Sequence, residues 1–239
     1  MDVSSEEIGL LQETRLGAFG GTFNPIHIGH IHVARRIQRL FGLSQVHFVV
    51  AATPPHKPPE RIVPLIHRYA MISLALSGTP AFVPSLLELE PPASPFSIHT
   101  LRKLSRKVAA RASCVYFIGG GDSLRDVRTW HESEQLLAAF NFIFVMRPGA
   151  EVGDPSQFLP SGVMDRVIDL RHGASGSVRR SIRRSQADKR RHIYLLDVGA
   201  PDISASVVRL RLAARRNIDG LVPTPVQEYI KKLQLYGDR

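Results

Sequence analysis

The chain has 239 residues, 44% of them hydrophobic and 22% charged, which excludes wholesale disorder and a fibrous repeat. Its one cysteine, Cys114, excludes an intramolecular disulfide and a zinc site built from several cysteines, and it favours the cytoplasm. The formal net charge of +10 is compatible with anionic partners. Residues 1–15 are acidic and have the pattern of neither a signal peptide nor a membrane anchor.

We expect residues 1–15 to form an N-terminal extension and residues 16–239 a single domain. An apolar run at residues 15–23 ends near a glycine pair, and residues 28–41 then carry apolar side chains at helical spacing. This order predicts a strand, a glycine turn and a helix at the start of the domain.

Apolar strands and amphipathic helices alternate through most of the remaining chain. The predicted strands are residues 46–52, a weaker pair at 82–89, 114–118, 142–146 and 193–198. The predicted helices are residues 64–76, 97–108 with Ser97 as N-cap, 134–140, 204–215 and 225–235, with a second glycine turn at 119–123.

This alternation predicts an α/β fold. We expect a Rossmann-like, doubly wound and mainly parallel sheet, with helices on both faces and a C-terminal helical segment. Ligands bind at the carboxyl ends of the strands in such sheets. Both glycine turns fall at these ends.

Most of the net charge comes from residues 171–192, which hold eight Lys or Arg and one acid. We interpret about 151–192 as a basic insertion, because the segment has too few apolar residues for a core of its own. An exposed mobile segment or a solvated helix at about 178–187 is expected, without catalytic duty. A nucleic-acid-binding function is disfavoured because the basic run lacks interleaved aromatic residues.

The string G-G-T-F-N-P-I-H-I-G-H at residues 20–30 is the strongest candidate site. Glycines let a phosphate approach backbone N–H groups, and the helix that follows adds partial positive charge at its start. His27 and His30 are three residues apart, so both can face one ligand, and Gly29 leaves room between them. The combination predicts an anion-binding site.

This string resembles the H-x-G-H motif of the nucleotidyltransferase superfamily. Class I aminoacyl-tRNA synthetases share it, but their Lys-rich KMSKS loop has no counterpart here. The sequence I-S-A-S-V-V-R at residues 203–209 instead resembles the C-terminal Ile-Ser-(Ser/Thr)-x-x-x-Arg pattern of the adenylyltransferase branch.

Five further segments resemble motifs of the bacterial nicotinate-nucleotide adenylyltransferases, in family order. They are P-P-H-K at 54–57, F-S-I-H-T-L at 96–101, G-G-D-S-L at 120–124 followed by Trp130, V-M-R-P-G at 145–149, and Val222-Pro223 with Val226, Tyr229 and Ile230. Four positions depart from the family pattern: Asn24 and His99 replace Asp, Gly121 replaces Ala, and Ala205 replaces Ser.

The resemblance implies adenylyl transfer from ATP to nicotinate mononucleotide, giving nicotinate adenine dinucleotide and pyrophosphate in NAD synthesis. Mg²⁺ would accompany ATP, held mainly by phosphates and water, so no metal site built from protein ligands is expected. The expected partners are ATP and nicotinate mononucleotide. No membrane association is expected, and a homo-oligomer is compatible with the sequence.

The resemblance also implies roles for individual residues. The implied catalytic residues are His27, His30, Lys57 and Arg209. The implied ATP-binding residues are Gly20, Gly21, Thr22, Phe23, Gly29, Asp122, Arg147, Ile203, Ser204 and Ser206. The implied nicotinate-nucleotide-binding residues are Asn24, Thr100, Trp130 and His131, with backbone N–H groups near Thr100 and His131 binding the carboxylate.

Two alternatives remain open at this stage. An adenylyltransferase for another acceptor, nicotinamide mononucleotide or phosphopantetheine, would share H-x-G-H, and the net charge raises a nucleic-acid-binding module. Asp122 has the alternative role of capping the next helix at the surface.

Overall fold

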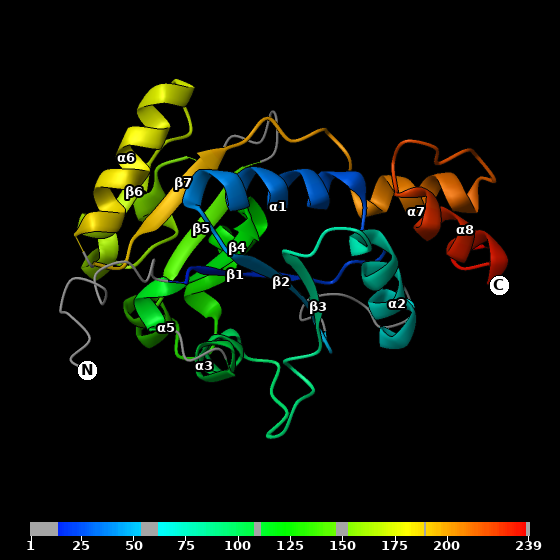
Figure 1. Ribbon diagram of the computed structural model, residues 1–239, viewed down its shortest axis with the longest axis horizontal. Helices are drawn as coiled ribbons and strands as arrows, with labels where there is room; N and C mark the ends of the chain where they lie inside the picture. Colours follow the sequence, from blue (N-terminus) through cyan, green and yellow to red (C-terminus); the bar gives the residue numbers. More distant parts are fainter. Residues whose placement is uncertain (1–13, 54–61, 108–110, 147–152, 189, 238–239) are drawn as a thin grey trace, which may run out of the picture.

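The computed structural model describes residues 14–53, 62–107, 111–146, 153–188 and 190–237. Within them, seven strands form one parallel sheet in the order β3-β2-β1-β4-β5-β7-β6 (Figure 1). The strands are β1 (Leu16–Gly21), β2 (Gln45–Val50), β3 (Phe82–Ser85), β4 (Val115–Gly120), β5 (Asn141–Met146), β6 (Val167–Asp169) and β7 (Ile193–Asp197).

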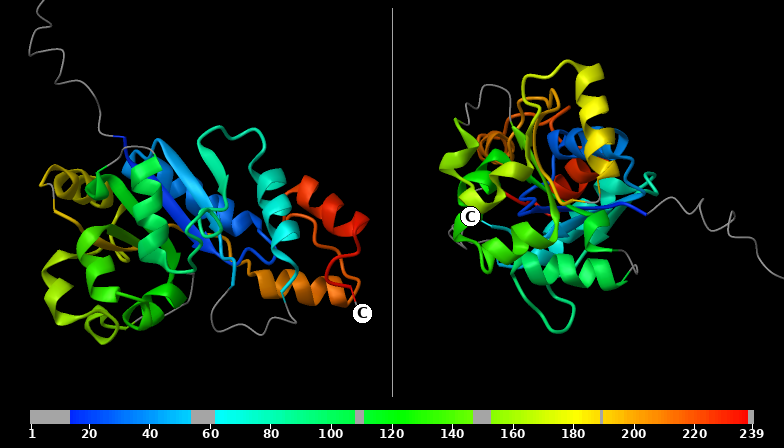
Figure 2. Two further views of the ribbon diagram at one scale, coloured as in Figure 1. Left: turned by 90° about the horizontal axis from the view of Figure 1, so that it is seen from below. Right: turned by 90° about the vertical axis from the view of Figure 1, so that its left-hand side faces the viewer.

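Helices cover both faces of this sheet. The right-hand view of Figure 2 shows α1 and α6 on one side and α3 and α5 on the other. The α-helices are α1 (Ile28–Phe41), α2 (Leu65–Leu76), α3 (Ser97–Lys107), α4 (Gly121–Asp126), α5 (Ser133–Ala139), α6 (Ser175–Ala187), α7 (Ala205–Ala213) and α8 (Thr224–Lys232). Short 3₁₀ helices are η3 (Ala112–Cys114), η4 (Val127–Thr129), η5 (Pro155–Gln157) and η6 (Ser161–Arg166).

Two hydrophobic clusters hold these layers together, one on each face of the sheet. Successive strand residues point to opposite faces, so Phe19 joins the cluster beneath α1 and Ala18 joins the one beneath α3. Tyr194 and Leu195 divide in the same way on β7. The prediction of a doubly wound parallel sheet is therefore confirmed.

The topology fixes where a ligand can bind. After β1 the chain continues into α1, which packs with one cluster, and after the adjacent β4 it continues into α4, which packs with the other. Chains that leave neighbouring strands toward opposite faces open a crevice at the carboxyl ends of those strands. The residues 20–30 line this crevice on the β1 side.

Some element boundaries differ from the sequence prediction. The expected strand pair at 82–89 is the single short strand β3, followed by a turn in which Leu89 N donates to Leu86 O. The expected turn at 119–123 is instead the end of β4 and the start of α4. Ser97 is the first residue of α3, not its cap, because Thr100 N already bonds to Phe96 O. Cys114 is buried, as expected, but lies in η3.

Of the two forms expected for the basic segment, the helix at about 178–187 is confirmed as α6, whereas the mobile excursion is wrong for the described residues, which belong to the folded core. Strand β6 extends the sheet beside β7, and α6 packs on α1. Val178 and Ile182 are buried at i and i+4, and the Ser185 hydroxyl lies 2.9 Å from the Tyr194 hydroxyl. The arginines of α6 are exposed, so the helix is solvated on one face only.

None of the helices in the described residues is long and apolar enough to cross a membrane. The division into an extension at residues 1–15 and a single domain stays a prediction, since residues 1–13 lie outside the described part.

Candidate active site

Two histidine rings face each other at the start of α1. His27 is the N-cap residue, with extended backbone, and its N–H donates to His30 Nδ1 at 3.2 Å. The ring centroids are 3.7 Å apart. Because His30 Nδ1 accepts a hydrogen bond, the neutral ring carries its proton on Nε2. In this tautomer His30 Nε2 is a hydrogen-bond donor, while His27, only 5% exposed, is buried against the His30 ring.

Gly29 makes this stacked arrangement possible. A Cβ atom at this position would lie 3.0 Å from His27 Nδ1 and 3.5 Å from the carbonyl oxygen of Ile203. A side chain would therefore press on the His27 ring, whereas the contact with Ile203 is an ordinary van der Waals distance. Sequence analysis assigned Gly29 to ligand approach, and the structure adds a packing reason.

The glycine pair makes room for two aromatic rings. A Cβ on Gly20 would lie 3.2 Å from the Phe117 ring, and one on Gly21 would lie 2.9 Å from the Phe23 ring. Phe23 is buried, with φ of 48°, and its ring centroid is 5.0 Å from that of His30. Its side chain therefore supports His30 from the core, and any contact of Gly20, Gly21 or Phe23 with ATP would come from backbone atoms.

Asn24 joins three segments beneath the site. Its side-chain oxygen accepts hydrogen bonds from Val63 N at 3.2 Å and from the Tyr236 hydroxyl at 2.9 Å. Its backbone oxygen accepts one from Arg209 Nη1 at 2.7 Å. Asn24 is 5% exposed, so these contacts make it a positioning residue, and its predicted contact with the acceptor stays a prediction.

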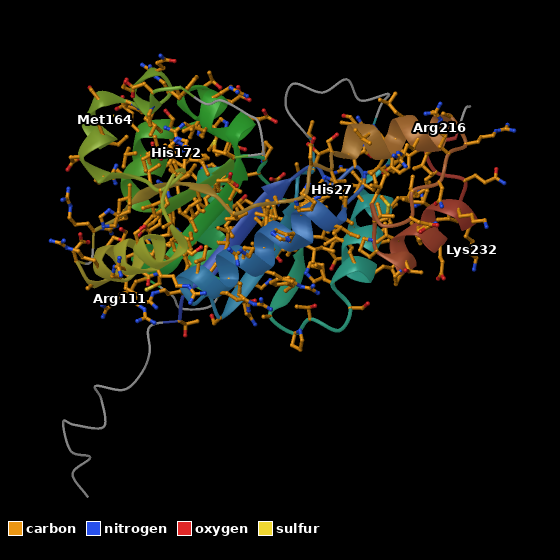
Figure 3. All side chains as sticks on the ribbon, turned by 90° about the horizontal axis from the view of Figure 1, so that it is seen from above. His27, Arg111, Met164, His172, Arg216 and Lys232 are labelled. Carbon is orange, nitrogen blue, oxygen red and sulfur yellow. The ribbon has the colours of Figure 1, made fainter. Side chains whose placement is uncertain are left out.

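The C-terminal motif lies beside the start of α1. Ser204 caps α7 by accepting from Val207 N at 3.2 Å, and Arg209 Nη2 donates to Ser206 Oγ at 3.1 Å. Ile28 N donates to Leu221 O at 2.9 Å, which fixes the C-terminal region to α1. Figure 1 shows α7 at this end of α1, and Figure 3 labels His27 there.

The starts of α1 and α7 therefore lie close together, with His27, His30 and Arg209 beside them. The positive end of a helix dipole attracts anions, and Arg209 adds a planar cation that suits phosphate oxygens. The distant segments 20–30 and 203–209 are brought together, as sequence analysis predicted.

Sequence analysis missed a buried arginine that supports the site. Arg68, 2% exposed, donates to Val63 O at 3.1 Å, Thr22 O at 3.0 Å and Ala51 O at 2.7 Å. The guanidinium thus ties the segment after β1 to the segment after β2, and burial lowers its pKa. One signal was available: Arg68 lies on the apolar face of the predicted helix, three residues before Met71.

Glu88 is the acidic residue whose charge interacts with that of Arg68. One of its oxygens accepts from Ala52 N at 2.8 Å. Burial raises the pKa of Glu88 to about 7, against the smaller opposing effects of that hydrogen bond and of the Arg68 and Lys103 charges. The carboxyl therefore titrates near neutral pH.

The predicted acceptor side is built from rings near the surface. Trp130 is half-buried and meets the edge of Phe117, the ring that also lies against Gly20, at a centroid distance of 5.3 Å. His131 is exposed and stacks on Phe96 at 4.0 Å, while Thr100 is buried and donates to Phe96 O at 3.4 Å. Phe117 therefore connects the ATP side to the acceptor side.

Three predicted residues have a weaker structural basis. The Asp122 side chain, 75% exposed, lies in the first turn of α4 and pairs with Arg125 at 3.3 Å. Gly120 is the N-cap of that helix, so the capping alternative for Asp122 is wrong. Lys57 and Arg147 lie outside the described residues, so their predicted roles stay predictions.

The sequence and the fold are similar to those of known proteins. The sequence profile of the cytidylyltransferase-like family matches residues 18–211. The probable nicotinate-nucleotide adenylyltransferase of Geobacter metallireducens is 38% identical over 223 residues, which cover 93% of this chain and 98% of that protein. The protein of the same name from Thermomicrobium roseum is 36% identical, with coverage of 93% and 92%.

A solved structure shares the fold. The nicotinic acid mononucleotide adenylyltransferase of Plasmodium falciparum complexed with NaAD aligns with a TM-score of 0.65 over 93% of this chain and 97% of that chain. The sequence identity is 19%, so this likeness concerns the fold alone.

Proposed function

The chain belongs to the nicotinate-nucleotide adenylyltransferase family, and from this premise we propose that it transfers the adenylyl group of ATP to nicotinate mononucleotide in NAD synthesis. The products are nicotinate adenine dinucleotide and pyrophosphate. The observation that carries the proposal is the convergence of His27, His30 and Arg209 at two helix starts.

The reaction needs positioning and positive charge more than it needs a base. An oxygen of the mononucleotide phosphate attacks the α-phosphorus of ATP, and the bond from that phosphorus to the bridging oxygen of the β-phosphate breaks. The attacking phosphate is already ionised at neutral pH, so no side chain has to remove a proton. The barrier comes from bringing two anions together while charge builds on the leaving pyrophosphate.

The residues at the start of α1 suit this task. His30 would donate from Nε2 to a phosphate oxygen, and the buried His27 ring packs against it. Arg209 and the start of α7 suit the β- and γ-phosphates, because a planar guanidinium binds two oxygens at once. Trp130 offers an aromatic face for the pyridine ring, and backbone N–H groups near Thr100 and His131 would bind the carboxylate.

We propose that Mg²⁺ enters with ATP. The ion prefers oxygen ligands and keeps several waters, so phosphates and water can supply most of its coordination. Among the described residues, Asp122 offers an exposed carboxylate at this edge of the sheet. When bound, the ion neutralises phosphate charge. We also place the protein in the cytoplasm, in line with its single cysteine.

Acceptor competition tests the proposal. The purified full chain would receive ATP and, in separate assays, nicotinate mononucleotide, nicotinamide mononucleotide or phosphopantetheine, with pyrophosphate release as the readout. We expect kcat/KM for nicotinate mononucleotide to exceed the others by about 10²-fold or more, because N–H donors matched to a carboxylate are left poorly paired by other groups. A higher value for either of the other acceptors would contradict the assigned substrate.

A further inference from the structure

Two histidines and a glutamate meet where α3 approaches the turn before α5. His99 lies on α3, and His131 and Glu132 precede α5. One ligand atom from each of the three residues lies within 4.8 Å of the other two. None of these side chains has a part in the adenylyl transfer described above, where His131 contributes a backbone group.

The His99 ring is held by a neighbouring hydroxyl. Its Nδ1 lies 2.8 Å from Ser94 Oγ, and that hydroxyl also accepts from Phe96 N at 3.3 Å. In the tautomer that carries its proton on Nδ1, His99 donates to Ser94 Oγ and presents the lone pair of Nε2 to a ligand. Histidines that bind metals almost always use their second nitrogen in this way.

The other two residues are oriented by contacts of their own. The His131 ring stacks on Phe96, and His131 Nε2 lies 3.2 Å from Glu132 Oε1. The second oxygen of Glu132, Oε2, lies 3.5 Å from Arg102 Nη2. Glu132 has φ of 50°, a left-handed conformation that is uncommon for a non-glycine residue and is often retained at functional sites.

We propose that His99, His131 and Glu132 bind a divalent transition-metal ion, for which Zn²⁺ is the best match. Two imidazole nitrogens and one carboxylate oxygen form a three-ligand set that Zn²⁺ accepts, leaving one position for water or another ligand. Mg²⁺ is a poor match because it prefers an all-oxygen shell. The site is thus distinct from the Mg²⁺ that accompanies ATP, and its existence does not depend on the proposed reaction.

A metal at this place would join two parts of the acceptor side. His99 belongs to α3, whereas His131 directly follows Trp130. The bound ion would therefore restrain the turn that carries Trp130. Metal binding should also raise the melting temperature, because it stabilises only the folded state.

The test measures Zn²⁺ binding to the full chain after removal of metals with a chelator. Competition with a chromophoric chelator gives the affinity, and Co²⁺ in place of Zn²⁺ gives an absorption spectrum that reports the ligand geometry. We expect each chain to bind one Zn²⁺ ion tightly. The variants His99→Ala and Glu132→Gln should each weaken binding by about 100-fold or more, and Ser94→Ala by about 10-fold, as loss of a supporting hydrogen bond does.

His172→Ala is the matched control. His172 is exposed, as His131 is, and it has no part in the cluster. This variant should bind Zn²⁺ like the unmodified chain. Unchanged affinity in both His99→Ala and Ser94→Ala, or absence of a tightly bound Zn²⁺ ion in the unmodified chain, would overturn the proposal. Circular dichroism shows whether each variant is folded. If His99→Ala does not fold, the Zn²⁺ affinity of Ser94→Ala still tests the proposal.

Discussion

The two sides of the candidate site are built differently. On the ATP side, His27, Asn24 and Arg68 are at most 5% exposed, and Asn24 and Arg68 hydrogen-bond to segments far apart in sequence. On the acceptor side, Phe96 is 41% exposed and His131 is exposed, and they contact mainly other rings. A substitution on the ATP side therefore disturbs both framework and chemistry, whereas one on the acceptor side removes a single contact.

The largest expected effect comes from His30→Ala on the ATP side. Loss of one donor aimed at charge that develops in the transition state typically costs about 10²–10³-fold in rate. We expect kcat to fall by that factor while KM for ATP changes much less, as measured by steady-state kinetics.

His32→Ala provides a control in the same helix. His32 is half-buried and its Nε2 lies 3.4 Å from Val198 O, away from the stacked pair. We expect nearly unchanged kinetics for this variant. A His30→Ala enzyme with the kcat of the unmodified chain would remove His30 from the catalytic role.

Trp130→Ala should show the opposite pattern, with a smaller effect confined to one substrate. Stacking on an aromatic ring is worth about 1–3 kcal/mol per base. KM for nicotinate mononucleotide should therefore rise by about 5- to 150-fold, while KM for ATP stays within about twofold. Trp130→Phe, which keeps an aromatic face, should recover part of the loss. Equal loss for both substrates would show that Trp130 supports the fold through Phe117 instead.

The smallest expected effect concerns Glu88 in the layer beneath the ATP side. Between pH 4.5 and about 7 the folded protein retains a proton on Glu88 that the unfolded chain has already released. The contribution of Glu88 to the free energy of unfolding is therefore fully present below pH 4.5 and is lost as the pH rises through about 7.

Glu88→Gln should remove this pH dependence and can still accept from Ala52 N. We expect the variant to gain about 2–3 kcal/mol over the unmodified chain between pH 5 and pH 8, measured by urea unfolding, since one pKa unit is about 1.4 kcal/mol. Glu90→Gln is the control, because Glu90 forms an exposed ion pair with Lys107. A flat difference across this pH range would contradict the raised pKa.

The sequence predicted the elements whose pattern is local. The helix expected at residues 28–41 has those bounds in the structure, because its apolar spacing, the preceding glycines and Gly42 in the left-handed conformation all agree. The convergence of segments 20–30 and 203–209 was predictable only through the resemblance to a family. Nothing local places residues almost 180 positions apart beside each other.

The missed features depend on tertiary contacts. Arg68 looks like a surface charge until the carbonyl groups of Thr22 and Ala51 are placed around it. The helix α6 has a narrow apolar stripe, Val178 and Ile182, which suffices only because α1 supplies the opposing surface. The metal cluster likewise requires α3 and the turn before α5 to be adjacent.

The pairing of β1 with β4 also constrains how the protein is made. Leu16 pairs with Val115, about 100 residues later in the chain, so β1 has only β2 as a neighbour while the ribosome synthesises the intervening segment. Unpaired edges of apolar strands are sites of aggregation, and long-range parallel pairing is slow. A nascent chain that stalls before β4 would present such an edge. The sheet can close around β1 only after the first half of the chain has been synthesised.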